Sequence, residues 1–142
     1  MWNARNAVLA GLCLLGLSGC GLFGGGPRDV SYARPLPAGL VQGATLDVQV
    51  YRNDTRLELT NTTARSFGPS TVWINERFSL PIDGFAIGES LDLKLRSFVD
   101  EFGNPFRAGG FFATEVPDLV VLAQLEHEGE LLGLVVTGND VQ

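Results

Sequence analysis

Apolar and polar residues alternate with a period of two along several short stretches of the chain. Leu46, Val48 and Val50 alternate with polar or amphipathic neighbours, and Leu91 and Leu93 are separated by Asp92. Side chains on a strand point to opposite faces in turn, so this spacing predicts strands that bury one face. On this basis we expect strands at 46–51, 56–60, 71–78, 91–96, 119–125 and 131–137, with a further strand within 106–114.

Turn residues separate these stretches. Asn53-Asp54, Ile87-Gly88-Glu89-Ser90 and Glu128-Gly129 each lie between two alternating stretches, and the chain contains 18 Gly and 7 Pro. Short strands joined by such turns are typical of all-β domains. The sequence therefore predicts a small antiparallel β-sandwich over residues 45–138, followed by a C-terminal tail at 139–142.

The N-terminal segment has a different pattern. Arg5 supplies a positive charge, and residues 7–17 then form an uncharged apolar run. A membrane-spanning helix needs about 20 apolar residues, so this run is too short to cross a bilayer. A short positive start followed by such a run is typical of a cleaved signal peptide, which we place at residues 1–19.

The end of this run, Leu17-Ser18-Gly19-Cys20, resembles the lipobox of bacterial lipoproteins at all four positions. The resemblance implies cleavage between Gly19 and Cys20, and attachment of a diacylglyceryl group and fatty acids such as palmitate to Cys20. The absence of Asp at the position after Cys20 further implies export to the outer membrane, facing the periplasm. An ordinary secretory cleavage site near a chance cysteine is the alternative.

Residues 20–44 are expected to form the lipidated end and a tether. Gly24-Gly25-Gly26-Pro27 and Arg34-Pro35-Leu36-Pro37 have a composition that cannot bury enough surface to fold alone. The three glycines lack the Gly-Lys-Ser/Thr ending of a phosphate-binding loop.

Residues 57–95 resemble small immunoglobulin-like domains of bacterial surface proteins. The resemblance lies in Thr60-Asn61-Thr62-Thr63 at the end of one strand and in Ile87-Gly88-Glu89-Ser90-Leu91 at the start of another. It implies an immunoglobulin-like architecture, but no function.

Charge and cysteine content narrow the function. The formal net charge is −6, and the nine arginines and Lys94 are scattered among 16 acidic residues. This distribution argues against nucleic acid as a partner and gives no overall attraction to anionic lipid. Cys13 lies in the expected signal peptide, so after cleavage neither a disulfide nor a Cys/His zinc site can form. We expect no metal and no cofactor.

Polar candidates for catalysis are few. His127 is the only histidine and lies beside the predicted turn Glu128-Gly129, where we expect an exposed, charged position. The acidic residues that could converge from loops are Asp83, Asp100, Glu101 and Glu115. Solubilising turn residues are the simpler interpretation, and a carboxylate hydrolase is the alternative.

Aromatic residues are the main candidates for contacts. Five of the nine phenylalanines lie within residues 98–112, namely Phe98, Phe102, Phe106, Phe111 and Phe112. They either fill one end of the core or form the rim of a binding loop, and we favour the core. Trp73 is expected on the face opposite Val72 and Ile74, where it covers the sheet or stacks on a ligand.

Together these patterns predict a non-catalytic lipoprotein of the cell envelope. Its β domain would contact an envelope protein at the membrane surface. The alternative is a binder of glycan or peptidoglycan that uses Trp73, Phe102, Phe106 or Phe111.

Overall fold

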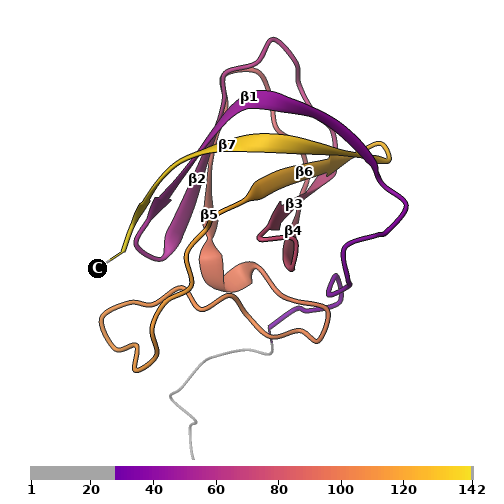
Figure 1. Ribbon diagram of the computed structural model, residues 1–142. Helices are drawn as coiled ribbons and strands as arrows, with labels where there is room; N and C mark the ends of the chain where they lie inside the picture. Colours follow the sequence, from indigo (N-terminus) through magenta and orange to yellow (C-terminus); the bar gives the residue numbers. More distant parts are fainter. Residues whose placement is uncertain (1–27, 142) are drawn as a thin grey trace, which may run out of the picture.

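The computed structural model describes residues 28–141, which form seven strands and one 3-10 turn (Figure 1). The strands belong to a single sheet, and within the described residues no helix is long and apolar enough to span a bilayer. The elements are β1 (Val41–Asn53), β2 (Arg56–Asn61), β3 (Ser70–Ile74), β4 (Phe78–Ile82), β5 (Ser90–Lys94), the 3-10 turn η1 (Leu95–Ser97), β6 (Ala123–His127) and β7 (Glu130–Asp140).

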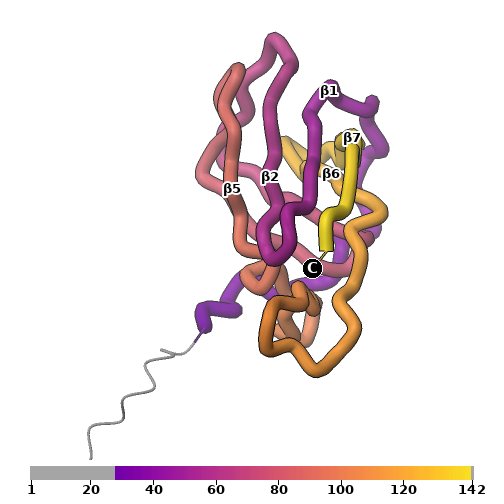
Figure 2. Tube along the Cα trace, turned by 90° about the vertical axis from the view of Figure 1, so that its left-hand side faces the viewer, coloured from indigo at the N-terminus to yellow at the C-terminus, as the bar shows by residue number. Residues whose placement is uncertain are grey.

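The sheet has the order β4-β3-β6-β7-β1-β2-β5. All neighbouring strands are antiparallel except β1 and β7, which are parallel. The pairing of β1 with β7 shifts in register at three places, and such irregularities bend and twist a strand. The long arched strands β1 and β7 curl the sheet, as Figures 1 and 2 show from two sides. The two ends of the sheet thereby enclose an apolar core.

Tight turns join three pairs of neighbouring strands: two residues separate β1 from β2 and β6 from β7, and three residues separate β3 from β4. The turn at Glu128 and Gly129 has positive φ at both positions (49° and 83°), and Asn75 and Glu76 have φ of 54° and 56°. Positive φ at both central residues is the geometry whose twist matches an antiparallel hairpin. The predicted turn after Asn53 also joins β1 to β2, so the first and last predicted hairpins are confirmed.

Four predicted strands differ from the observed ones. The strand expected at 91–96 ends at Lys94, and Leu95 and Arg96 lie in the 3-10 turn η1. The stretch 71–78 is two strands, because Asn75 and Glu76 turn the chain and pair β3 with β4. The stretch 106–114 contains no strand, and the one expected at 119–125 begins only at Ala123. The all-β class is confirmed, but the sheet is mixed and continuous where two antiparallel sheets were expected.

Part of the expected tether packs on the domain. β1 begins at Val41, four residues before the predicted domain boundary at 45. The Tyr32 hydroxyl donates a hydrogen bond to the Ser97 carbonyl oxygen (2.5 Å), and Arg34 pairs with Glu126 on β6 (2.6 Å). Because of these contacts, the free tether is shorter than the expected range of residues 20–44. The expected signal peptide, Gly19 and Cys20 lie outside the described residues.

Candidate functional site

The phenylalanine-rich stretch divides between core and surface. Phe98 and Phe106 are buried, whereas Phe102, Phe111 and Phe112 are 79%, 95% and 90% exposed. The preferred interpretation, that these rings fill the core, therefore holds for two of the five. Phe106 cannot contact a partner as predicted, because its ring lies inside the core and packs edge-on against Phe78 (5.2 Å between ring centroids).

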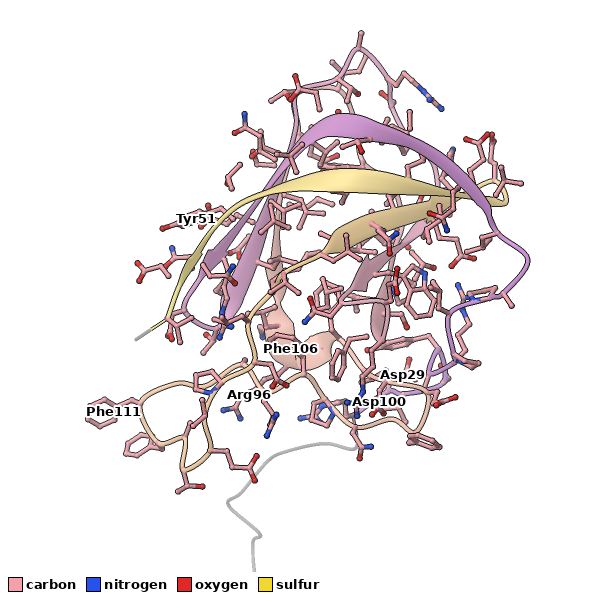
Figure 3. All side chains as sticks on the ribbon, viewed as in Figure 1. Asp29, Tyr51, Arg96, Asp100, Phe106 and Phe111 are labelled. Carbon is pink, nitrogen blue, oxygen red and sulfur yellow. The ribbon has the colours of Figure 1, made fainter. Side chains whose placement is uncertain are left out.

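Residues 109–118 form a projecting loop, which we call the aromatic loop. It extends away from the strands at the lower end of the molecule, and Phe111 points outward from it (Figure 3). Gly109 and Gly110 have φ of 82° and 110°, a backbone region that other residues rarely adopt, so the loop begins at a pair of glycines. At its tip the rings of Phe111 and Phe112 pack edge-on, with centroids 4.9 Å apart.

A buried arginine holds the base of the aromatic loop. The Arg52 guanidinium donates hydrogen bonds to the carbonyl oxygens of Asp54 (2.9 Å), Ala108 (2.6 Å) and Asp118. It also faces the ring of Phe106, 5.7 Å from the centroid. Burial lowers the pKa of Arg52, opposed by the charges of Asp54 and Asp118, but an arginine in a protein stays protonated. Arg52 therefore links the β1-β2 hairpin to both ends of the loop.

Basic side chains surround the tip of the aromatic loop. Arg28, Arg96 and Arg107 line a surface depression of about 270 Å³ together with Phe112. A second depression, of about 390 Å³, brings Arg56, Lys94 and Arg96 beside Phe111 and Phe112. Arg96 is fixed by a hydrogen bond to the Gly109 carbonyl oxygen (2.8 Å). Five of the nine basic residues that follow Cys20 thus lie next to this loop, a clustering that the sequence pattern did not predict.

Some of these charges are paired. Arg107 contacts Asp118 (2.6 Å) and lies 4.0 Å from Glu115, and Arg56 pairs with Asp92. The hydrogen bond from Arg56 lowers the pKa of Asp92. Counting Asp29, Asp92, Asp118 and Glu115 against the five basic residues leaves an excess of one positive charge. The chain as a whole has a net charge of −6, so the surroundings of the aromatic loop are slightly basic on an acidic protein.

Trp73 is not available as a stacking platform. Its side chain has no exposed surface, and its indole Nε1 donates a hydrogen bond to Glu126 Oε2 (2.7 Å). The guanidinium of Arg34 lies 5.0 Å from the ring centroid, so residues preceding β1 cover the outer face of β3. The alternation around Trp73 correctly placed it opposite its neighbours, but it could not reveal this cover. A contact role for Trp73 was therefore wrong.

The four candidate carboxylates do not converge. Asp100 is buried, and its carboxylate oxygens already have partners. It pairs with Arg77 (2.9 Å) and accepts hydrogen bonds from the backbone N–H groups of Phe102 and Asn104 (3.1 and 2.8 Å). Burial raises the pKa of Asp100, but these hydrogen bonds outweigh burial and hold the pKa below its ordinary value. Asp83, Glu101 and Glu115 are exposed and border separate depressions. No group of three metal-ligating side chains occurs within residues 28–141.

His127 is largely buried, which differs from the exposed position expected beside the turn. Its side chain is 12% exposed, its Nδ1 lies 2.8 Å from Ser70 Oγ, and its ring packs edge-on against Phe67. The sequence could not indicate this pair, because 57 residues separate its members. Ser70 Oγ also lies 2.8 Å from the Gly68 carbonyl oxygen, an acceptor, so its single hydrogen is shared between two neighbouring acceptor positions.

We compared the chain with protein-family models, curated proteins and solved structures, and none of them matches.

Proposed function

We propose that this chain is a lipoprotein of the cell envelope, anchored through Cys20 and carrying a non-catalytic β domain. The observation that carries the proposal is Leu17-Ser18-Gly19-Cys20 directly after an uncharged apolar run. A thiol can form the thioether to a diacylglyceryl group, and Ser18 and Gly19 are small enough for the cleft of a peptidase. Two or more acyl chains hold a protein firmly on a bilayer, whereas one chain binds only marginally.

We further propose that the domain is immunoglobulin-like. In that fold, strands A, B and E pair in one sheet and strands C, F and G in the other. The pairings β1-β2-β5 and β3-β6-β7 correspond to these two sets, and β4 extends the second set beside β3. β1 joins the sets into one sheet because it pairs with both β2 and β7.

One contact supports this architecture. The two motifs that carried the resemblance meet: Thr60 and Ser90 are paired across β2 and β5, and the Asn61 backbone N–H donates to the Glu89 carbonyl oxygen (2.9 Å).

The domain would face the periplasm from the outer membrane. The residues after Cys20 are Gly21 and Leu22, and the lack of Asp there favours the outer membrane by resemblance to Gram-negative lipoproteins. Separation of the two membranes on a density gradient tests this location. Recovery of the protein with the inner membrane would contradict it.

Replacement of the cysteine tests the anchor. We expect Cys20→Ser to abolish incorporation of labelled palmitate and to leave the protein uncleaved or released from the membrane fraction. Cys13→Ser is the matched control, because Cys13 lies in the expected signal peptide and should not alter labelling. Equal palmitate labelling of Cys20→Ser and the unmodified chain would refute the proposal.

A further inference from the structure

The tip of the aromatic loop is an apolar protrusion within a basic surround. Phe111, Phe112 and Val116 are 95%, 90% and 82% exposed. Large exposed apolar side chains gathered at one place mark surfaces that bind a partner protein or a membrane. The loop is held in position by Arg52 and by the Asp118 backbone N–H, which donates to the Arg107 carbonyl oxygen (2.9 Å). The rings are thus presented by a fixed support.

We propose that the aromatic loop contacts the phospholipid bilayer, with Phe111 and Phe112 in the interfacial region and the neighbouring basic side chains against lipid phosphates. The proposal rests on the proposed anchor at Cys20, which would bring the domain to the bilayer. It adds a second contact, which orients the domain at the surface.

The charges fit a bilayer that contains anionic lipid. Arg28, Arg96 and Arg107 line one depression beside Phe112, and Arg56, Lys94 and Arg96 line the other. Basic residues close to an anionic bilayer are attracted by its surface potential, and guanidinium groups bind phosphate oxygens well. The acidic remainder of the protein is repelled from the same surface, so charge favours approach by this end.

The start of the described chain lies beside the loop. Arg28 lines the same depression as Phe112, and Cys20 precedes Arg28 by eight residues. A fully extended chain spans at most about 3.6 Å per residue, so a lipidated Cys20 lies within about 29 Å of Arg28. Figure 2 shows the indigo start of the described chain and the orange loop at the same end of the molecule. The anchor would therefore hold this end closest to the bilayer.

A second exposed phenylalanine segment lies at the same end. Phe102 is 79% exposed in the turn that begins at Asp100, and Figure 3 places Asp100 at the lower end with the aromatic loop. The aromatic loop projects from the strands, and Phe111 points outward from it (Figure 3). A projecting ring enters a deformable lipid surface without requiring a complementary cavity in a partner.

A tryptophan at the tip reports directly on lipid contact. The lipidated protein carrying Phe112→Trp is purified and reconstituted in vesicles of phosphatidylcholine and phosphatidylglycerol, with or without phosphatidylcholine brominated on its acyl chains. Trp73 is fully buried, so its emission provides a constant background. We expect the emission of the introduced tryptophan to shift to shorter wavelength and to be quenched by bromine.

Ile87→Trp is the matched control. Ile87 is 59% exposed and lies in the turn before β5, at the end of that strand opposite η1 and the aromatic loop. We expect bromine quenching at position 112 to exceed that at position 87 by roughly twofold or more, as expected for a ring at the headgroup boundary. Equal quenching at the two positions would overturn the proposal. An absence of bromine quenching in a Phe112→Trp protein whose Cys20 is shown by mass spectrometry to be lipidated would overturn it too.

Mass spectrometry of the same sample separates the two proposals. An unmodified Cys20 would refute the anchor, whereas a lipidated Cys20 without quenching at position 112 would refute only the membrane contact of the loop. A crosslink from position 112 to another protein, without quenching by brominated lipid, would likewise assign the loop to a protein partner and contradict the bilayer.

Discussion

Arg52 is the residue through which the aromatic loop is coupled to the stability of the domain. It is the only arginine among the buried residues of the described chain, and it donates to three backbone carbonyl oxygens, those of Asp54, Ala108 and Asp118. Arg52→Met keeps a long side chain that can pack on Phe106 but removes every donor. The three carbonyl oxygens then lose their partner.

The expected loss of stability follows from two opposing effects. A hydrogen bond from a charged donor contributes about 1.5 to 3 kcal/mol, so three such bonds contribute up to about 9 kcal/mol before other costs. Removing the buried guanidinium also removes its desolvation penalty, which is several kcal/mol. We therefore expect Arg52→Met to lower the free energy of unfolding by about 2 to 4 kcal/mol.

Urea unfolding followed by the fluorescence of Trp73 measures this change. With a slope of about 2 kcal/mol per molar urea, the midpoint should fall by about 1 to 2 M. Arg52→Lys should lie in between, because an ammonium group keeps the charge but cannot reproduce the planar fork of a guanidinium. In Arg52→Met the amide of Asp118 should also exchange with solvent faster than in the unmodified protein.

Arg65→Met provides the control. Arg65 is exposed, and its guanidinium lies 5.1 Å from the centroid of the Phe67 ring. Its replacement should shift the midpoint only slightly, since exposed contacts of this type contribute about 0.5 to 1 kcal/mol. If Arg52→Met and Arg65→Met shift the midpoint equally, the assignment of Arg52 as the support of the loop is refuted.

Three further predictions concern buried polar contacts. Asn61→Ala removes the side-chain hydrogen bonds to the carbonyl oxygens of Arg65 (2.8 Å) and Ala86 (2.9 Å). Thermal unfolding should show a free energy of unfolding lower by about 1 to 3 kcal/mol, and an unchanged Tm would contradict the role of Asn61. Because the pKa of Asp100 is lowered in the folded state, its contribution to stability is complete above the unfolded pKa of about 3.9 and is lost as the pH falls through the folded value. Urea midpoints measured from pH 7 to pH 2 should therefore depend less on pH in Asp100→Asn, and parallel curves would refute this. Glu126→Gln weakens the acceptor of Trp73 and Arg34, so the urea midpoint should fall by the equivalent of about 1 kcal/mol and the near-ultraviolet dichroism of Trp73 should change; an unaltered spectrum would argue against the contact.

Local patterns predicted the strands with one buried face. The alternation at Leu57 and Leu59 and the turn at Glu128-Gly129 correspond to observed elements, because side-chain period and turn geometry are local properties. The turn between β3 and β4 was missed because strand-forming residues lie on both sides of the short interruption at Asn75 and Glu76, and a pair without Gly is a weak turn signature.

Burial imposed by distant segments could not be predicted. Trp73 is covered by Arg34 and by Glu126, 39 residues before it and 53 residues after it in the sequence. The five phenylalanines likewise carry no local mark that separates Phe98 and Phe106 in the core from the exposed rings. Their separation follows from the path of the chain between η1 and β6, which lacks a repeating pattern and is fixed by Arg52 and by the glycines at 109 and 110.

The basic surround of the aromatic loop also escaped the sequence pattern. Arg28 and Arg56 are far in the sequence from Lys94, Arg96 and Arg107, and Arg28 and Lys94 each have an acidic residue within two positions. The fold brings the three parts of the chain to one end of the molecule. The overall acidity correctly described the protein but not this surface.

The most direct test of the lipoprotein account is the intact mass of the mature N-terminal peptide. The account predicts that the peptide begins at Cys20 and carries a diacylglyceryl group on the thiol, with or without a further acyl chain on the amino group. A peptide that begins elsewhere, or that begins at an unmodified Cys20, would contradict it.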